Sequence, residues 1–409
     1  MECKNKVITI IGAGPAGMML AWLLVKNKTR VKLIERHLDF SREFRGEGIQ
    51  ESVMKHLEDF NLLSPIMTKK MGVRAEAARV FFNELPVAVL KGSRQGSDFG
   101  IILHQEKFLK FLHDELSNSD LFQSYMGHSA ISFEEDHHKI SHVITRDKNK
   151  TEHRIAGDLM IITAGRGTNL RKQLNMKAKK IATHWNILWL LLPKPENKEL
   201  IPNGFRAYLN GDSLFIMYTN ADGMIQLAWS KKDEATLKSK DFNFKKSELL
   251  DEIPGPYKNL VKNGFSESTK TQFLKVECDR LHKWHHKNCL FIGDAAHTMT
   301  PVGGQGINLA IRDSIVTANH ILDAIASNTL NAEDIFSSIQ AERMREIRLM
   351  QTFQKKFGFF MLGAPKLLSR IFFFFILPVL GAIGIRQRML KKVQGGVSFV
   401  KFKYEASLK

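Results

Sequence analysis

The stretch VITIIGAGPAGMMLAWLLVKNKTRVKLIE, residues 7–35, decides the fold of this chain. An apolar run is followed by a Gly-x-Gly-x-x-Gly loop, a helical run and a second apolar run that ends in an acid. This is the βαβ pattern of a dinucleotide-binding unit. The first glycine permits a tight turn, the second lets the main chain approach a pyrophosphate, and the third lets the helix pack on the strand. We therefore predict a dinucleotide site at Gly12, Gly14, Pro15, Ala16 and Gly17.

The acid that closes this pattern is Glu35. A carboxylate about twenty residues after the glycines can accept a hydrogen bond from a ribose 2′-hydroxyl. Its charge disfavours a 2′-phosphate, which argues against NADP at this particular site. Two basic residues complete the predicted contacts: Arg36 follows the acid directly, and Arg45 lies in a polar loop beside Gly46, where its charge could neutralise a pyrophosphate.

A second ligand-type stretch is LFIGDAAHTMTPVGGQGIN, residues 290–308. An apolar strand breaks at Gly293-Asp294, and the chain re-enters helix after Pro301 through a glycine-rich turn. A helix start offers unpaired N–H groups and the positive end of a dipole. We expect Asp294, at the carboxyl end of the strand, to accept hydrogen bonds from ligand hydroxyls. The alternative is a plain strand–turn–helix connection whose glycines only allow tight packing.

Length and composition set broad limits. A chain of 409 residues can form two domains, or one large α/β domain with an insertion. The 44% hydrophobic and 25% charged residues are typical of a soluble globular protein. Three cysteines without metal-ligand spacing argue against a disulfide framework and a metal site, and they suit a reducing cytoplasm. The apolar stretch at the N-terminus is too short for a signal peptide, so we expect a cytoplasmic protein.

The formal net charge of +18 is unevenly distributed. Residues 340–409 hold 14 Lys and Arg against 3 Asp and Glu, a surplus of +11. Basic tails bind nucleic acid or anionic lipid, and we predict no nucleic-acid partner because no such motif is present. The apolar run of residues 371–385 is shorter than the roughly 20 residues of a bilayer span. We expect helices that cap a cavity, with peripheral contact to the inner face of an anionic membrane as the second interpretation.

The middle of the chain predicts an antiparallel sheet between residues 181 and 276. Strands are expected at 184–192, 205–209, 213–218 and 224–229, with hairpin turns at Asn210-Gly211 and Asp222-Gly223. The predicted domains are therefore 1–180 and 277–330 for nucleotide binding, 181–276 for the substrate, and 331–409 for C-terminal helices. Five aromatic residues of the sheet could line a pocket or form ordinary core: Trp185, Trp189, Tyr208, Tyr218 and Trp229.

These motifs together resemble one family. The resemblance rests on the Gly-x-Gly-x-x-Gly loop with its acid, and on Gly-Asp-Ala-Ala-His followed by Pro-x-Gly-x-Gln-Gly-x-Asn in residues 293–308. The chain is similar over nearly its whole length to the single-component FAD-dependent aromatic hydroxylases, such as the para-hydroxybenzoate and ubiquinone-biosynthesis hydroxylases. The resemblance implies an α/β fold: a Rossmann-like FAD-binding domain, an inserted antiparallel-sheet substrate domain and C-terminal helices.

The resemblance also implies roles for residues. Arg45 and Gln105 correspond to an arginine and a glutamine that contact FAD, and Asp294 to the acid on the ribityl chain. The helix start would face the flavin pyrimidine edge, where its dipole stabilises the negative charge of reduced flavin; its residues are Gly304, Gln305, Gly306, Ile307 and Asn308. His297 and Pro301 would lie nearest this edge. No catalytic side chain is assigned, since a structural hydrogen bond of His297 competes with a general-base role.

The reaction that the resemblance implies is monooxygenation. NADH or NADPH reduces FAD, O2 adds to give a flavin C4a-hydroperoxide, and one oxygen atom is transferred to an apolar or aromatic small molecule. The family's middle motif is Gly-Ala-Asp-Gly-x-x-Ser-x-Val-Arg, whereas residues 162–171 read ITAGRGTNLR. Ala164 stands in place of the aspartate and Thr168 in place of the serine. Because the family's motif takes part in handling both FAD and NAD(P)H, we expect the loss of the aspartate to affect the reduction of FAD or the preference for NADH or NADPH.

Two other functions compete with this interpretation. The first is a FAD-dependent reductase or oxidase of a polyprenyl or lipid substrate on the same fold, which the Phe-rich tail would also suit. The second is a flavin-bound scaffold or membrane-associated binding protein without catalysis. A halogenase is disfavoured because residues 185–189, WNILW, lack the Trp-x-Trp-x-Ile-Pro pattern of that group. The sequence leaves a monomer and a homodimer equally open.

Overall fold

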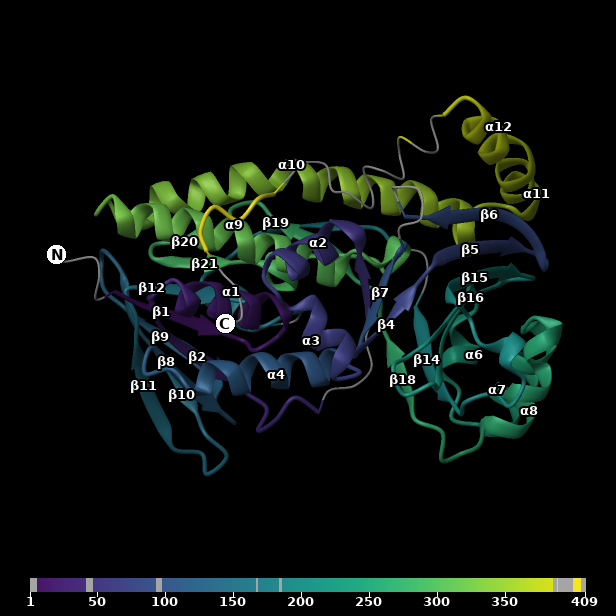
Figure 1. Ribbon diagram of the computed structural model, residues 1–409, viewed down its shortest axis with the longest axis horizontal. Helices are drawn as coiled ribbons and strands as arrows, with labels where there is room; N and C mark the ends of the chain where they lie inside the picture. The colour runs from purple at the N-terminus through teal and green to yellow at the C-terminus, as the bar shows by residue number, and fades with distance from the viewer. Residues whose placement is uncertain are drawn as a thin grey trace.

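The computed structural model describes residues 6–41, 47–92, 98–166, 168–183, 186–384, 388 and 400–405. One half of the molecule (Figure 1) is built on a six-stranded sheet of order β20-β21-β12-β1-β2-β8. Its strands are β1 (Val7–Ile11), β2 (Arg30–Glu35), β8 (Phe122–Met126), β12 (Leu159–Ile162), β20 (His285–His286) and β21 (Cys289–Phe291). All pairs are parallel except β20 with β21. Strand β1 lies between β2 and β12, which makes its carboxyl end the topological switch point where such sheets bind ligands.

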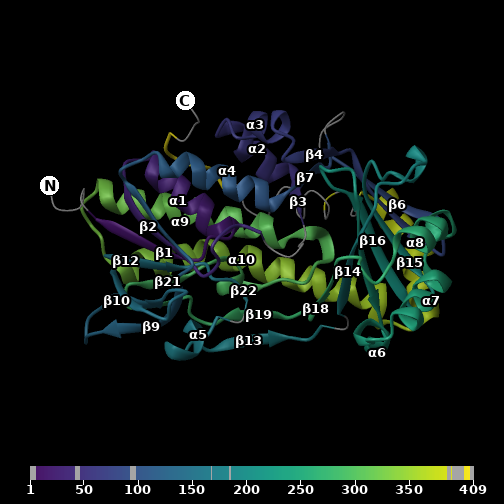
Figure 2. The same ribbon diagram turned by 90° about the horizontal axis from the view of Figure 1, so that it is seen from below.

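Both faces of this sheet are covered, which is why its parallel strands are continuous apolar runs. Figure 2 shows helices α1 (Pro15–Lys26), α4 (Gln105–Ser117) and α9 (Gly306–Ala326) on one side. On the other side lies an antiparallel sheet of β9 (Ser129–Glu135), β10 (Ile140–Arg146) and β11 (Glu152–Ala156). Helix α1 is apolar all round, and residues 16–25 are buried accordingly.

The other half contains a seven-stranded sheet of order β18-β14-β17-β16-β15-β5-β6. The strands are β5 (Ala77–Phe82), β6 (Leu85–Lys91), β14 (Ile187–Leu192), β15 (Gly204–Asn210), β16 (Ser213–Thr219), β17 (Ile225–Lys231) and β18 (Thr271–Leu274). Both expected hairpins are present, between β15 and β16 and between β16 and β17. One face of the sheet is covered by α6 (Glu234–Lys238), α7 (Phe242–Glu252) and α8 (Lys258–Gly264).

This sheet extends beyond the predicted substrate domain of residues 181–276. Strands β5 and β6 come from residues 77–91, which the sequence interpretation assigned to the nucleotide-binding part, and β5 pairs in parallel with β15. Phe81 of β5 stacks on Tyr208 of β15 with ring centroids 4.4 Å apart. This pairing joins segments more than a hundred residues apart in the sequence, so no local sequence pattern predicts it.

Short elements connect the two halves. One small sheet has the order β3-β7-β4 and another β13-β19-β22. Their strands are β3 (Gly48–Gln50), β4 (Gly72–Ala75), β7 (Gly100–Leu103), β13 (Ala178–Ile181), β19 (Cys278–Leu281) and β22 (His297–Thr298). The short helices are α2 (Glu51–Asp59), α3 (Leu63–Thr68) and α5 (Leu170–Gln173). Helix α2 begins at Glu51, directly after β3.

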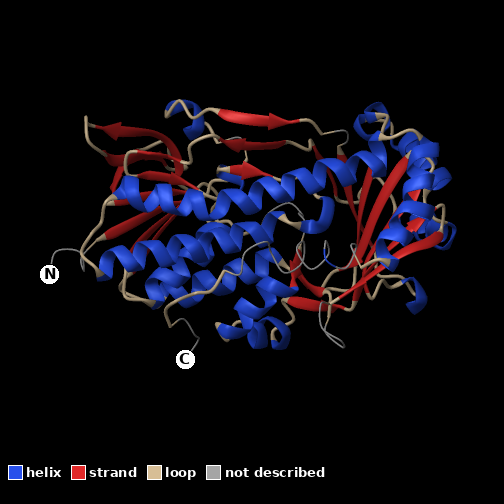
Figure 3. Ribbon diagram, turned by 90° about the horizontal axis from the view of Figure 1, so that it is seen from above, coloured by secondary structure: helices blue, strands red, loops and turns tan. Residues whose placement is uncertain are grey.

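Helix α10 (Ala332–Gly358) is the longest described element and runs along both halves (Figures 1 and 3). Its start is capped by Asn331, whose side chain accepts a hydrogen bond from the Glu333 N–H. Acids occupy its first turn and lysines its last, as the helix dipole favours. It packs on α9 beside the six-stranded sheet and reaches the seven-stranded sheet with its C-terminal turns.

Four further helical segments follow at the far end of the molecule (Figure 1). They are the π-helical η6 (Phe359–Gly363), α11 (Lys366–Ile371), the π-helical η7 (Phe372–Ile376) and α12 (Leu377–Ala382). Phe360 stacks on Phe372 with centroids 4.1 Å apart, which holds the turn together. Within the described residues no single helix has the length and apolar character of a membrane span; α10–η6 followed by α11–α12, bent by 119°, meets those two criteria only as a pair.

Candidate active site

The loops after β1, β2, β12 and β21 converge on one cavity of ≈ 1490 Å³. This is the convergence that the switch point predicts. Most sequence-predicted contacts lie on its wall: Gly12, Gly14, Pro15, Ala16, Glu35, Arg36, Gln105, Asp294, Pro301, Gly304, Gln305, Gly306 and Ile307. Arg45 and Trp185 lie outside the described residues.

The glycine loop provides a surface that side chains would fill. Gly12 has φ +112°, and a Cβ there would lie 2.7 Å from the Thr163 carbonyl oxygen. A Cβ on Gly17 would lie 1.9 Å from the Gly12 carbonyl oxygen. Gly17 therefore packs helix α1 against the loop rather than lining the cavity. The Thr163 hydroxyl donates to the same carbonyl at 2.6 Å, which fixes the turn.

Glu35 stands at the end of β2 and faces the cavity. Its Oε2 accepts from the Ala13 N–H at 2.7 Å, and its Oε1 from the His37 N–H at 3.1 Å. These bonds orient the carboxylate at the cavity wall, where it is placed to meet a ribose hydroxyl. Arg36 donates from Nε to His37 Nε2 at 3.0 Å.

The turn that carries Asp294, η4 (Gly293–Ala295), is held from below by Arg171. The guanidinium forms an ion pair with Asp279 at 2.7 Å and donates to the carbonyls of Ala295 at 2.7 Å and Asp294 at 3.2 Å. These three bonds leave the Asp294 side chain on the cavity wall. The sequence interpretation assigned Arg171 no role; its place at the end of the middle motif was the available indication.

The start of α9 follows the turn η5 (Val302–Gly304). Gly303 and Gly304 both have left-handed φ values, +75° and +60°, which glycine adopts without strain. Asn308, predicted to contact the cofactor, does not line the cavity. Its side chain instead donates to the carbonyls of Gly48 and Gly304, both at 2.8 Å, and so fastens β3 to the helix start.

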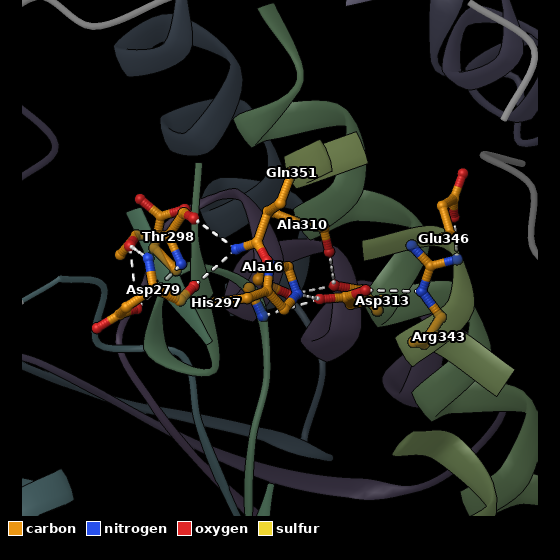
Figure 4. A network of polar contacts seen from close by, with 12 residues as sticks. Ala16, Asp279, His297, Thr298, Ala310, Asp313, Arg343, Glu346 and Gln351 are labelled. Atoms are coloured by element: carbon orange, nitrogen blue, oxygen red, sulfur yellow. Dashed lines mark hydrogen bonds and ion pairs between the residues drawn. The ribbon is translucent and has the colours of Figure 1, made fainter. Parts of the chain in front are cut away.

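The sequence interpretation placed His297 near the flavin edge, but His297 does not line the cavity. It belongs to a buried polar network with Asp313, Arg343 and Glu346 (Figure 4). The residue is 1% exposed, and its Nε2 lies 2.7 Å from Asp313 on α9. Asp313 also accepts from the Gly293 N–H at 2.9 Å and from Arg343 of α10 at 2.7 Å. Burial would raise the pKa of Asp313, but the charges and hydrogen bonds of His297 and Arg343 lower it to about 2.

This buried network continues along α10. Arg343 and Arg312 both pair with Glu346, Arg312 at 2.6 Å. Gln354 donates to the carbonyls of Thr300 and Val302, both at 2.8 Å, and thereby holds the turn around Pro301. These side chains therefore position the Asp294 and Pro301 turns without lining the cavity themselves.

The other end of the cavity is apolar. Alternate residues of the seven-stranded sheet face it, among them Ile187, Trp189, Ala207, Ile216 and Ala228. The opposite wall is formed by Phe353 and Phe357 of α10, Met361 of η6 and Leu377 of α12. Of the predicted aromatic residues, Trp189 and Tyr218 line the cavity, whereas Tyr208 and Trp229 pack on the other face of the sheet.

The residues present fit FAD. One end of the cavity has a main-chain cradle for a pyrophosphate, an oriented carboxylate at Glu35, a second carboxylate at Asp294 and a helix start at Gly306. These features are spread over the loops of four strands, as an extended dinucleotide requires. Ala164 lies on the same wall beside Gly12, so an aspartate at this position would face the same space.

Comparisons with known proteins agree with this geometry. The family model described as FAD binding domain matches residues 4–344. The 6-methylpretetramide 4-monooxygenase of Streptomyces rimosus is 24% identical over 346 residues, covering 83% of this chain and 80% of that protein. A kynurenine 3-monooxygenase of Stenotrophomonas maltophilia is 23% identical, covering 85% and 77%.

Solved structures share the fold. PqsL of P. aeruginosa, in complex with 2-aminobenzoylacetate, superposes with a TM-score of 0.74 at 18% identity, covering 88% of this chain and 97% of PqsL. A flavin-dependent brominase gives 0.75 at 14% identity, covering 98% and 96%.

The chain belongs to the FAD-binding-domain family that the first of these comparisons defines. It is a flavoprotein oxidoreductase, an FAD-dependent monooxygenase of the para-hydroxybenzoate hydroxylase-like group. NADH or NADPH is the reductant typical of that family. The reductase and scaffold alternatives are not favoured, since the relatives are monooxygenases.

Proposed function

We propose that this monooxygenase hydroxylates an apolar aromatic small molecule held at the sheet end of the cavity. The observation that carries the proposal is one continuous cavity with nucleotide-binding turns at one end and aromatic and aliphatic side chains at the other. Two relatives, named as monooxygenases of 6-methylpretetramide and of kynurenine, support it.

The protein itself would position FAD and the substrate and would exclude water from the cavity. Gly12, Gly14 and Glu35 would hold the adenosine and pyrophosphate part of FAD, and Asp294 the ribityl chain. When bound, FAD would accept a hydride from NAD(P)H and activate O2, which is chemistry that side chains do not supply. With FAD bound, the start of α9 would present N–H dipoles to the pyrimidine edge, where negative charge develops. The apolar wall around Trp189 and Phe353 would keep water from the reacting centre.

The test uses the purified protein with FAD bound. NADH and NADPH oxidation is followed in air against a panel of phenols, quinone precursors and polyprenyl lipids, and products are analysed by mass spectrometry under isotopically labelled O2. We expect faster oxidation with an aromatic compound and one labelled oxygen atom in its product. Reduction of a lipid double bond without labelled oxygen would contradict the proposal.

We also propose that this protein is cytoplasmic and contacts the inner face of an anionic membrane through its C-terminal helices. In support, α11, η7, α12 and the residue that follows α12 expose large apolar side chains: Leu367, Leu368, Ile371, Phe374, Phe375, Ile376, Val379 and Ile383. Lys366 and Arg370 flank it. Leu377 of the same helices faces the cavity, so an apolar substrate could pass from lipid to the site.

Sedimentation with phosphatidylglycerol vesicles tests this contact. The double variant Phe375→Asp, Val379→Asp should lower vesicle binding about tenfold or more, because two apolar side chains no longer enter the lipid. Phe244→Asp, at another exposed apolar position, on α7, is the control and should bind like the wild type. Equal binding of all three proteins would exclude the C-terminal helices as the contact.

A further inference from the structure

Two alanines face the cavity where β5 pairs with β15 in the seven-stranded sheet. In the parallel register of these strands, Ala78 lies beside Phe205, and Ala207 lies beside Val80. All four residues line the cavity, as the alternation of side chains along a strand requires. The two alanines are half-buried rather than fully covered. The cavity therefore reaches down to the sheet between these two strands.

Larger side chains surround the two alanines. Ile216 of β16 lies beside Ala207, and Leu90 of β6 lies beside Ala78. A methyl group between longer side chains leaves a depression in the cavity wall, which we call the alanine hollow. Ala88 of β6 continues the row of small side chains on the cavity wall. From Ala207 to Ala88 the row crosses two strand spacings, about 10 Å, which is longer than a single six-membered ring.

Aromatic rings line the cavity on both sides of this space. Phe205 contacts the rings of Phe99 and Tyr218, with centroids 6.0 Å and 5.2 Å apart. On the opposite wall, Phe353 and Phe357 stack with centroids 5.6 Å apart and with their planes 16° from parallel. Aromatic side chains pack favourably against other flat rings, face to face with an offset or edge to face. The walls therefore suit a flat aromatic molecule.

We propose that the alanine hollow binds the distal rings of a fused-ring aromatic substrate, and that Ala78 and Ala207 determine how many rings the enzyme accepts. The reacting ring would lie towards FAD, and the additional rings would lie over the hollow. A larger side chain at either position would occupy the hollow and restrict the enzyme to smaller substrates. This inference rests on the proposed aromatic hydroxylation, which it deepens by naming the substrate class.

Equilibrium dialysis with the oxidised, FAD-loaded protein measures binding without turnover. Phenol, 2-naphthol and 2-hydroxyanthracene carry one hydroxyl each and differ in the number of fused rings, whereas 4-hexylphenol carries a flexible chain on one ring. We expect the affinity of the wild type to rise about tenfold with each added ring, because each ring buries more apolar surface. We expect 4-hexylphenol to bind more weakly than 2-hydroxyanthracene, because its chain loses conformational freedom.

Two variants fill the hollow with a side chain that suits a strand, Ala78→Ile and Ala207→Ile. Each should weaken the binding of 2-hydroxyanthracene about tenfold or more, while the binding of phenol stays within about twofold of the wild type. Ala341→Ile makes the same change at an exposed position of α10 and is the control. It should bind all four probes like the wild type.

Three results would overturn the inference. Equal affinity of the wild type for the three fused-ring probes would show that the added rings find no site. Equal losses of phenol and 2-hydroxyanthracene in the two isoleucine variants would show that the alanines do not select by size. Tighter binding of 4-hexylphenol than of 2-hydroxyanthracene would overturn the fused-ring class. Failure of the proposed function is seen separately, as absence of any oxygenated aromatic product from the wild type.

Discussion

At the scale of single residues, substitution of Gly12 has the clearest expected effect on FAD binding. Gly12→Ala forces a side chain into a left-handed φ and against the Thr163 carbonyl. The strain alone costs about 1–2 kcal/mol, so FAD retention should fall roughly tenfold or more. The ratio of flavin to protein absorbance after gel filtration measures it. Gly255→Ala, where a Cβ meets only ordinary contacts at 3.7 Å, should retain full flavin. Equal flavin content in both variants would contradict the role of the Gly12 loop in binding FAD.

A second prediction concerns Ala164. Its side chain faces the cavity beside the glycine loop, in the place of the family's aspartate. Ala164→Asp should change the rate of flavin reduction by NADH or NADPH while flavin content stays the same, because the added charge lies next to the cofactor cradle. Anaerobic stopped-flow absorbance measures the rate. Ala164→Asn, of equal size without charge, is the control, and a rate unchanged in both variants would show that the departure has no effect on reduction.

The position of a residue on the cavity wall could be predicted where a contiguous motif defines it. Gly12 and Glu35 belong to a contiguous pattern, so their placement on the cavity followed from the sequence. The sequence was less informative about side chains that can form hydrogen bonds with several different partners. Asn308 and His297 come from the same motif as Gly304, yet both point to protein groups, because the buried N–H, C=O and carboxylate groups around them need hydrogen bonds.

At the scale of elements, Asp313 joins α9, α10 and the Asp294 turn. Asp313→Asn leaves Arg343 buried with a weaker partner and should lower the free energy of unfolding by about 3–5 kcal/mol. Urea denaturation at pH 7 measures it. Asp323→Asn, which breaks an exposed pair with Lys403, should cost about 0–1 kcal/mol. Similar losses in the two variants would show that the buried network does not stabilise the fold.

Asp313 also predicts that the folded protein loses stability at low pH. The pKa of Asp313 is lowered to about 2 in the folded protein from an ordinary 3.8. Its stabilising contribution is therefore complete above about pH 4 and is lost as the pH falls towards 2. The slope of unfolding free energy against pH in this window should be shallower in Asp313→Asn than in the wild type. An identical slope would assign acid unfolding to other carboxyl groups.

At the scale of the whole molecule, the seven-stranded sheet depends on two distant parts of the chain. A fragment of residues 181–276 lacks β5 and β6, so β15 loses its parallel neighbour and Tyr208 loses its stacking partner Phe81. We expect the fragment to show no cooperative thermal transition by circular dichroism, whereas the full chain does. A sharp transition in the fragment would show that the inserted segment is an independent domain. The hairpins within it were predictable because their turns are local; the β15–β5 pairing was not.

Helix α10 fixes a length within the enzyme. Arg343 lies in the network behind the Asp294 turn, and Phe357 lies on the substrate wall. At 1.5 Å per residue, the fourteen steps between them span about 21 Å. Helix α10 therefore sets the distance between the cofactor end of the cavity and the substrate wall. A single residue inserted between them would rotate the helix beyond it by about 100° and turn Phe357 away from the substrate wall, so the number of residues in this helix matters as much as their identity.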